Sequence, residues 1–203
     1  MPVTAPRLAV VAAVCALPAC VTGERPTLVP EPPVNDPAVE TVLERLDRAG
    51  STAFTAVYDI IPSSTGTTTT ATVRQGSDGR RRVTVGEIDY VVSGSTTRTC
   101  TIESCVDGLD DARISNLNIT HRFWGDSFAS RLRLDATRNI ADGRGRVETI
   151  AGQPAACVGV PVIGGTVDYC ALDAGVLGRY FGADVSIELT SYTQTVDDAL
   201  LDR

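Results

Sequence analysis

The spacing of apolar residues changes once along this chain, and that change sets the fold class. Between Pro37 and Gly50 the apolar residues recur at helical spacing, with Asp36 placed to cap the helix and Pro37 suited to its first turn. From Phe54 onward, apolar residues alternate with polar ones, as in a strand with one buried face. The sequence therefore predicts an amphipathic helix followed by a sheet.

Short alternating runs separated by turn sequences fill most of the remaining chain. Turns at Ser77–Gly79 and Ser93–Ser95 are typical of antiparallel meanders. In contrast, residues 107–139 indicate helix and loop, and a short helical turn is expected near residues 175–180. The expected strands are residues 54–60, 67–73, 82–85, 88–92, 96–102, 146–150, 156–162, 166–172 and 185–192.

The start of the chain has the pattern of a lipoprotein signal. An apolar run ends at Leu17-Pro18-Ala19 and is followed directly by Cys20. The run is shorter than the about 20 residues that a transmembrane helix needs, but it suits a secretory signal. We expect a signal peptide at residues 1–19, lipid on Cys20 and a Pro-rich tether at residues 20–35. The alternative is an ordinary signal peptide and a freely secreted protein.

Residues 36–203 are expected to form one acidic domain. The chain has 25 acidic and 18 basic residues, which gives a net charge of −7. This balance argues against nucleic acid, which requires a basic face, and against attraction to an anionic membrane surface. Attachment to the extracytoplasmic face of the cell membrane would therefore depend on the lipid. Every basic residue is Arg, so no Lys nucleophile or P-loop Lys is present.

Four cysteines of this domain are expected to form disulfides, because export places them in an oxidising compartment. They allow three pairings, of which sequence proximity favours Cys100–Cys105 and Cys157–Cys170. A four-cysteine zinc site is the rival, but the second pair lacks the usual C-x₂₋₄-C spacing. No metal or cofactor is expected.

The second cysteine pair brackets a predicted hairpin whose corner has two possible positions. A corner at residues 163–164 would place Cys157 directly opposite Cys170. A corner at residues 164–165 would place the two cysteines diagonally on the same face. Either register brings the sulfur atoms close together, and closing the loop would stabilise the fold by about 3 kcal/mol in the chain-entropy model.

No sequence motif predicts catalysis. Gly125-Asp126-Ser127-Phe128 is similar to the GDS block of one esterase family, but the only histidine, His121, precedes Ser127 and would lie on another helix face. We interpret the match as coincidental and His121 as a surface or capping residue, and we do not expect an enzyme. Arg80-Arg81-Arg82, beside a turn, is expected to be an exposed strand end, and the weaker alternative is a contact with acidic lipid head groups.

The aromatic residues within 123–132 have two interpretations. They can share one helical face, which is compatible with an ordinary core or with an apolar wall over a ligand cavity against the sheet. The tentative cavity residues are Phe54, Tyr58, Tyr90, Phe123, Trp124, Phe128 and Leu132.

The C-terminal half contains four blocks that suggest a family: Thr149–Pro154, Cys157-Val158, Tyr169-Cys170 and Ile187–Thr190. With the order of elements, they resemble the LolA/LppX/LprG-like superfamily of actinobacterial envelope lipoproteins. The resemblance implies an α+β fold, in which a curved antiparallel sheet (half-barrel) has helices covering its concave face. It also implies an anchored lipoprotein that binds or carries acyl chains. The alternative is a non-enzymatic envelope sensor or protein-interaction lipoprotein with a filled core.

Overall fold

A computed structural model describes residues 36–49 and 52–201. The predicted signal peptide, Cys20 and the tether lie outside these residues. Among the helices of the described part, none has the length and apolar character needed to cross a membrane.

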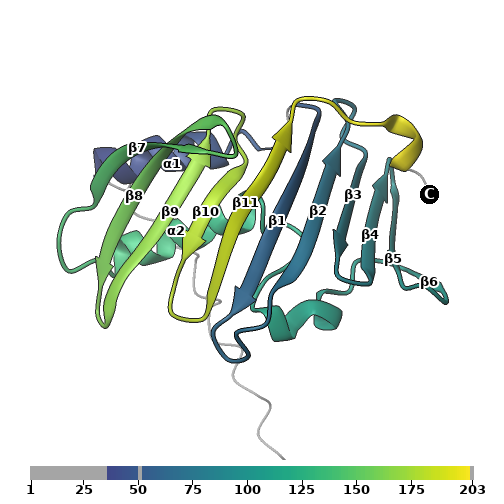
Figure 1. Cartoon of the computed structure of the whole chain (residues 1–203), viewed down its shortest axis with the longest axis horizontal. Coiled ribbons are helices and arrows are strands. Elements are labelled where there is room, and N and C mark those ends of the chain that lie inside the picture. The colour runs from purple at the N-terminus through teal and green to yellow at the C-terminus, as the bar shows by residue number, and fades with distance from the viewer. Residues whose placement is uncertain (1–35, 50–51, 202–203) are drawn as a thin grey trace, which may run out of the picture. The chain divides into compact units, whose positions relative to one another are not determined.

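Eleven antiparallel strands form one open sheet (Figure 1). Its order is β6-β5-β4-β3-β2-β1-β11-β10-β9-β8-β7, so two meanders are joined where β1 pairs with β11. The strands are β1 (Phe54–Pro62), β2 (Thr69–Gln75), β3 (Arg81–Val85), β4 (Ile88–Ser93), β5 (Thr96–Cys100), β6 (Cys105–Asp107), β7 (Arg144–Ile150), β8 (Gln153–Val162), β9 (Gly165–Leu172), β10 (Leu177–Phe181) and β11 (Val185–Thr193).

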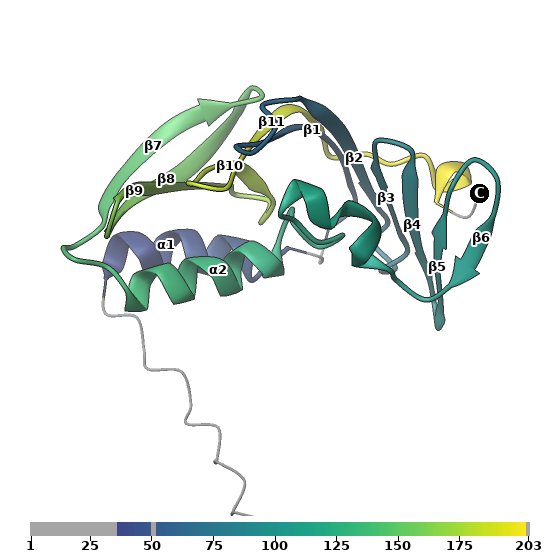
Figure 2. The same cartoon turned by 90° about the horizontal axis from the view of Figure 1, so that it is seen from below.

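Both α-helices and the first 3₁₀ helix lie on the concave side of this sheet (Figure 2). Figure 2 shows α1 and α2 side by side beneath the β7–β10 half. Strands β6 and β7 are consecutive in the chain but form opposite edges of the sheet, so the chain between them runs across the concave face. We call residues 108–143 the crossing segment. The helices are α1 (Pro37–Leu46), α2 (Asp126–Thr137) and two short 3₁₀ helices, η1 (Asp111–Leu117) and η2 (Asp198–Leu200). The expected fold class is confirmed.

Two local expectations are wrong. The helical turn expected near residues 175–180 is strand β10, which is hydrogen-bonded between β9 and β11. Its five residues include a register irregularity between Leu177 and Arg179, which hides the alternation of apolar residues. The helical face expected to carry the aromatic residues is also incomplete, because α2 starts at Asp126 and Phe123 and Trp124 precede it.

Helix α1 is positioned by its two ends. At the first, the Asp36 side chain accepts hydrogen bonds from the backbone of Ala38 and Val39. At the other end, the β9–β10 turn approaches so closely that Gly175 leaves no room for a side chain. A Cβ atom there would lie 2.7 Å from the Ala49 nitrogen, and the φ of Gly175 is +87°.

We predict that Gly175→Ala destabilises the fold more than Gly79→Ala. Gly79 has nearly the same φ, +84°, but a Cβ atom there meets nothing within 4 Å. Gly79→Ala should therefore lower the free energy of unfolding by the left-handed strain alone, about 1 kcal/mol. Gly175→Ala adds a clash with backbone and should cost about 2–4 kcal/mol. Denaturant unfolding of both variants measures the difference. Equal losses would contradict the close packing of the turn on α1.

Candidate functional site

The residues predicted to line a cavity lie on the concave side, between the sheet and the crossing segment. Each of the seven is at most 3% exposed. They come from β1, β4 and the crossing segment, which the fold brings together over distances of up to 78 residues in sequence (Phe54 to Leu132). The residues are Phe54, Tyr58, Tyr90, Phe123, Trp124, Phe128 and Leu132.

Five aromatic residues form what we call the central cluster: Phe54, Tyr58, Phe123, Trp124 and Tyr192. The Tyr58 and Phe123 rings meet edge to face with centroids 5.1 Å apart. Phe54 meets Trp124 at 5.4 Å and Tyr192 at 6.1 Å. The end of the crossing segment before α2 is therefore packed onto β1 and β11.

A second aromatic group holds α2 against the other half of the sheet. Phe128 packs on Tyr180 with centroids 4.7 Å apart, and Tyr180 packs on Tyr169 at 4.9 Å. The Tyr169 hydroxyl donates to the Asp135 carboxylate of α2 at 2.5 Å. Sequence reasoning did not include these tyrosines. The alternation of β9 could have identified Tyr169, whereas Tyr180 fell in the expected helical turn.

Tyr90 is separate from both groups. Its ring stacks on His121 with centroids 5.4 Å apart, and its hydroxyl donates to the Asp110 carbonyl at 3.0 Å. Burial, followed by the charge of Asp111, raises the pKa of Tyr90 to about 12. This residue thus attaches the start of the crossing segment to β4.

Polar atoms inside the central cluster have no hydrogen-bond partner among the described residues. These atoms are the hydroxyls of Tyr58 and Tyr192 and Nε1 of Trp124. Burial, and secondarily the neighbouring Tyr192, raises the pKa of Tyr58 well above its ordinary value. An unpaired buried polar group costs about 1–3 kcal/mol, and most buried polar groups in native proteins are paired. The cluster is therefore apolar in packing but has unused donors and acceptors.

An open pocket of about 440 Å³ lies between η1 and α2. Ile119 and Phe128 provide apolar lining, while Asp111, Ser127 and Arg131 provide polar groups. Because Phe128 also belongs to the second aromatic group, this pocket reaches the layer between the sheet and the crossing segment from outside.

The possible catalytic residues do not form a nucleophile–base pair within the described part of the chain. His121 is 9% exposed, so the expected surface position is wrong. Its Nδ1 lies 2.9 Å from the Asp111 carboxylate, because the turn before Phe123 folds back on η1. The Ser127 hydroxyl instead donates to the Arg122 carbonyl at 3.0 Å. This arrangement gives Ser127 no hydrogen-bonded base.

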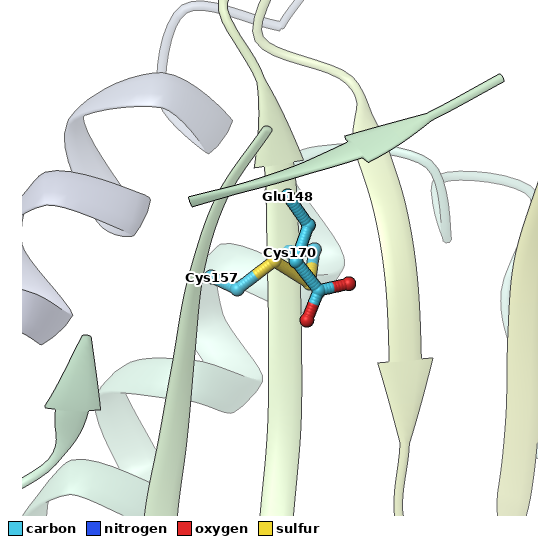
Figure 3. Close-up of side chains that lie close together, drawn as sticks. All are labelled: Glu148, Cys157 and Cys170. Atoms are coloured by element: carbon cyan, nitrogen blue, oxygen red, sulfur yellow. A yellow bond between two sulfur atoms is a disulfide. The ribbon is translucent and has the colours of Figure 1, made fainter. Parts of the chain in front are cut away.

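Both expected disulfides are present, and the hairpin corner lies at residues 163–164, because Val162 pairs with Gly165. Cys157 and Cys170 are therefore directly opposite. Figure 3 shows the Glu148 carboxylate beside their sulfur atoms. These two sulfurs are bonded to each other and offer no thiolate to a metal. Glu148 itself is engaged by Arg146, whose hydrogen bond is the main cause of the lowered pKa of Glu148.

No protein-family model matches the chain, and no curated protein matches it. Among solved structures, MucB matches with 15% identity and a TM-score of 0.48 over 81% of this chain, which spans 62% of the MucB chain. LprF from Mycobacterium bovis matches with 14% identity and a TM-score of 0.42, covering 79% of this chain and 95% of LprF. A LolA superfamily protein from Nitrosomonas europaea matches with 10% identity and a TM-score of 0.39, covering 81% and 97% respectively.

We predict that a mild thiol reductant opens Cys100–Cys105 well before Cys157–Cys170. Cys105 is exposed at the β5–β6 edge, whereas Cys157 and Cys170 are 2% and 0% exposed. Thiol–disulfide exchange requires access of the attacking thiolate to a sulfur atom. Alkylation of the folded protein at intervals, followed by peptide mass spectrometry, measures the order. Simultaneous opening of both disulfides under native conditions would contradict the prediction.

Proposed function

We propose that this chain is a lipid-anchored protein of the extracytoplasmic membrane surface that binds an amphiphile between its sheet and its crossing segment. The observation that carries this proposal is the central cluster, where Tyr58, Trp124 and Tyr192 bury polar atoms without partners. An amphiphile provides both apolar surface for the rings and polar atoms for these groups. A plain core would require only the former.

Acyl-chain burial would provide the binding energy. Each CH₂ group removed from water contributes about 0.8 kcal/mol, so one long chain suffices without extensive polar recognition. Entry would require the crossing segment to move away from the sheet. Three polar contacts oppose this movement on the β10–β11 side. The Leu177 N–H donates to the Trp124 carbonyl at 2.7 Å. Asp184 forms an ion pair with Arg131 at 2.5 Å, and its carbonyl accepts from Asn118 at 3.3 Å.

This role is non-enzymatic. The hydrogen bond of Ser127 to a backbone carbonyl and the pairing of His121 with Asp111 support it. Binding and release of a ligand need neither a nucleophile nor a base.

A second function is favoured by the close packing itself. All seven residues of the proposed cavity are at most 3% exposed, which is compatible with a filled core. In that case the protein would act as a non-enzymatic envelope sensor or protein-interaction lipoprotein, and a protein partner would replace the lipid ligand.

The anchor predicts a change of location. Cys20→Ala should move the protein from the membrane fraction to the soluble extracytoplasmic fraction, because the acidic domain has no electrostatic attraction to anionic lipid. Fractionation and immunoblotting of cells measure this, with Cys105→Ala as a matched cysteine control that should stay membrane-bound. Membrane retention of Cys20→Ala would contradict lipid anchoring.

Ligand uptake predicts a fluorescence signal from a single residue. Trp124 is the only tryptophan of the chain, so its emission reports on the central cluster alone. Emission should change when the Cys20→Ala protein is mixed with a long-chain fatty acid. Adding Asp184→Asn should accelerate the change up to about five-fold, since it removes an ion pair worth about 0–1 kcal/mol that holds the crossing segment.

Asp173→Asn is the matched control for that experiment. It removes the ion pair of Asp173 with Arg45 of α1, at 2.6 Å, and leaves the crossing segment unchanged. Its uptake rate should equal that of the parent protein. If the emission of Trp124 responds to no fatty acid, phospholipid or fatty alcohol, the amphiphile proposal fails and the filled-core function is favoured.

A further inference from the structure

Arg81 faces the concave side of the sheet, contrary to the expected exposed strand end. It lies two residues before Val83 in β3, and Val83 is 1% exposed in the core. Across the sheet, Arg81 is opposite Gln75, which is opposite Phe54. Trp124 covers this row: its ring centroid lies 5.6 Å from the Arg81 guanidinium carbon and 5.4 Å from the Phe54 ring. A cation is thus placed at the border of the central cluster.

This cation lacks an opposite charge. The neighbouring Arg82, on the other face, forms an ion pair with Asp89. The Arg81 side chain forms no ion pair or hydrogen bond with any described residue, and its Nε is buried without a partner. Burial, and secondarily the positive charge of Arg122, lowers the pKa of Arg81. In a chain with more acidic than basic residues, a half-buried Arg beside another Arg instead of a carboxylate marks a place for an external anion.

Further groups around Arg81 match an anionic head group. Nε1 of Trp124 is a buried donor without a partner, and it can donate only. Gln75 is 1% exposed; its amide nitrogen donates to the Thr52 carbonyl at 3.1 Å, while its oxygen is unpaired. The two donors, Arg81 and Trp124, suit the oxygens of a carboxylate or a phosphate. A phosphate that keeps one hydroxyl can in addition donate to the Gln75 oxygen.

We propose that Arg81, Trp124 and Gln75 form a subsite for the oxyanion of an amphiphile, a carboxylate or a phosphate, whose acyl chain lies along Phe54 and Tyr58. This inference rests on the proposed function and specifies its ligand class. Arg81 on β3 and Phe54 on β1 are two strand spacings apart, roughly 10 Å, on the concave face. A head group at Arg81 and the first carbons of its acyl chain at Phe54 therefore fit next to each other.

The test compares ligands that differ only in the head group. Palmitate, hexadecanol and a palmitoyl lysophosphatidate are titrated into the Cys20→Ala protein by isothermal titration calorimetry. Both anions should bind more tightly than the alcohol. Arg81→Met, which retains a long side chain over Trp124, should weaken anion binding about ten-fold or more and leave the alcohol unchanged. Tighter binding of lysophosphatidate than of palmitate would assign the subsite to a phosphate, and the reverse to a carboxylate.

Two further variants keep the result interpretable. Arg74→Met makes the same substitution on the neighbouring strand β2, at the position opposite Arg82 on the other face, and should change no affinity. Trp124→Phe keeps an aromatic ring but removes the Nε1 donor, so it should weaken anion binding by a few-fold. It tests the subsite independently in case Arg81→Met does not fold.

The outcomes separate this inference from the proposed function. Equal affinity for palmitate, lysophosphatidate and hexadecanol would sustain amphiphile binding and overturn the oxyanion subsite. An equal effect of Arg74→Met and Arg81→Met would also overturn it, because overall charge would then explain the preference. Binding of none of the three ligands would reject the proposed function itself, and the subsite with it.

Discussion

The rest of the structure depends on one topological constraint: β6 and β7 follow each other in the chain but form opposite edges of the sheet. The pairing of β1 with β11 creates this arrangement by joining two meanders at their inner strands. The chain must then span the full concave face, and the crossing segment buries that face as it does so. Neither η1 nor α2 needs to be a stable helix by itself, because burial against the sheet stabilises both.

The crossing segment is held unevenly. Near α2, aromatic packing is accompanied by satisfied polar contacts, such as the hydrogen bond of Tyr169 to Asp135. Near the start of the segment, Tyr90 donates to the Asp110 carbonyl. Between these two attachments, the Leu177 N–H of β10 donates to the Trp124 carbonyl at 2.7 Å, but the side-chain polar atoms of Tyr58 and Trp124 are buried without partners. The middle of the crossing segment is therefore held by its backbone and its rings, and its buried side-chain polar atoms contribute no hydrogen bonds.

Much of this architecture could be predicted from the sequence, because alternation reports which face of a strand is buried. The same rule could have placed Arg81 with Val83 on the concave face, but a run of three arginines beside a turn suggested exposure instead. Strand β10 could not be recognised, since five residues with a register irregularity carry too little periodicity. The contact of Tyr192 with Phe54 depends on the β1–β11 register, which no local pattern specifies.

Whether this region is a core or a ligand site depends on whether an acyl chain can replace the rings of the crossing segment on the sheet. It does not depend on how much apolar area is buried. If an acyl chain replaced the rings of the crossing segment on the sheet, the apolar face of β1 would stay buried, so the hydrophobic contribution there would be largely conserved. The polar atoms decide the balance. In the closed state Nε1 of Trp124 and the side-chain oxygen of Gln75 are desolvated without partners, at a cost of about 1–3 kcal/mol each. A ligand whose head group pairs these atoms and neutralises Arg81 would shift the balance toward the open state by removing costs that the closed state carries.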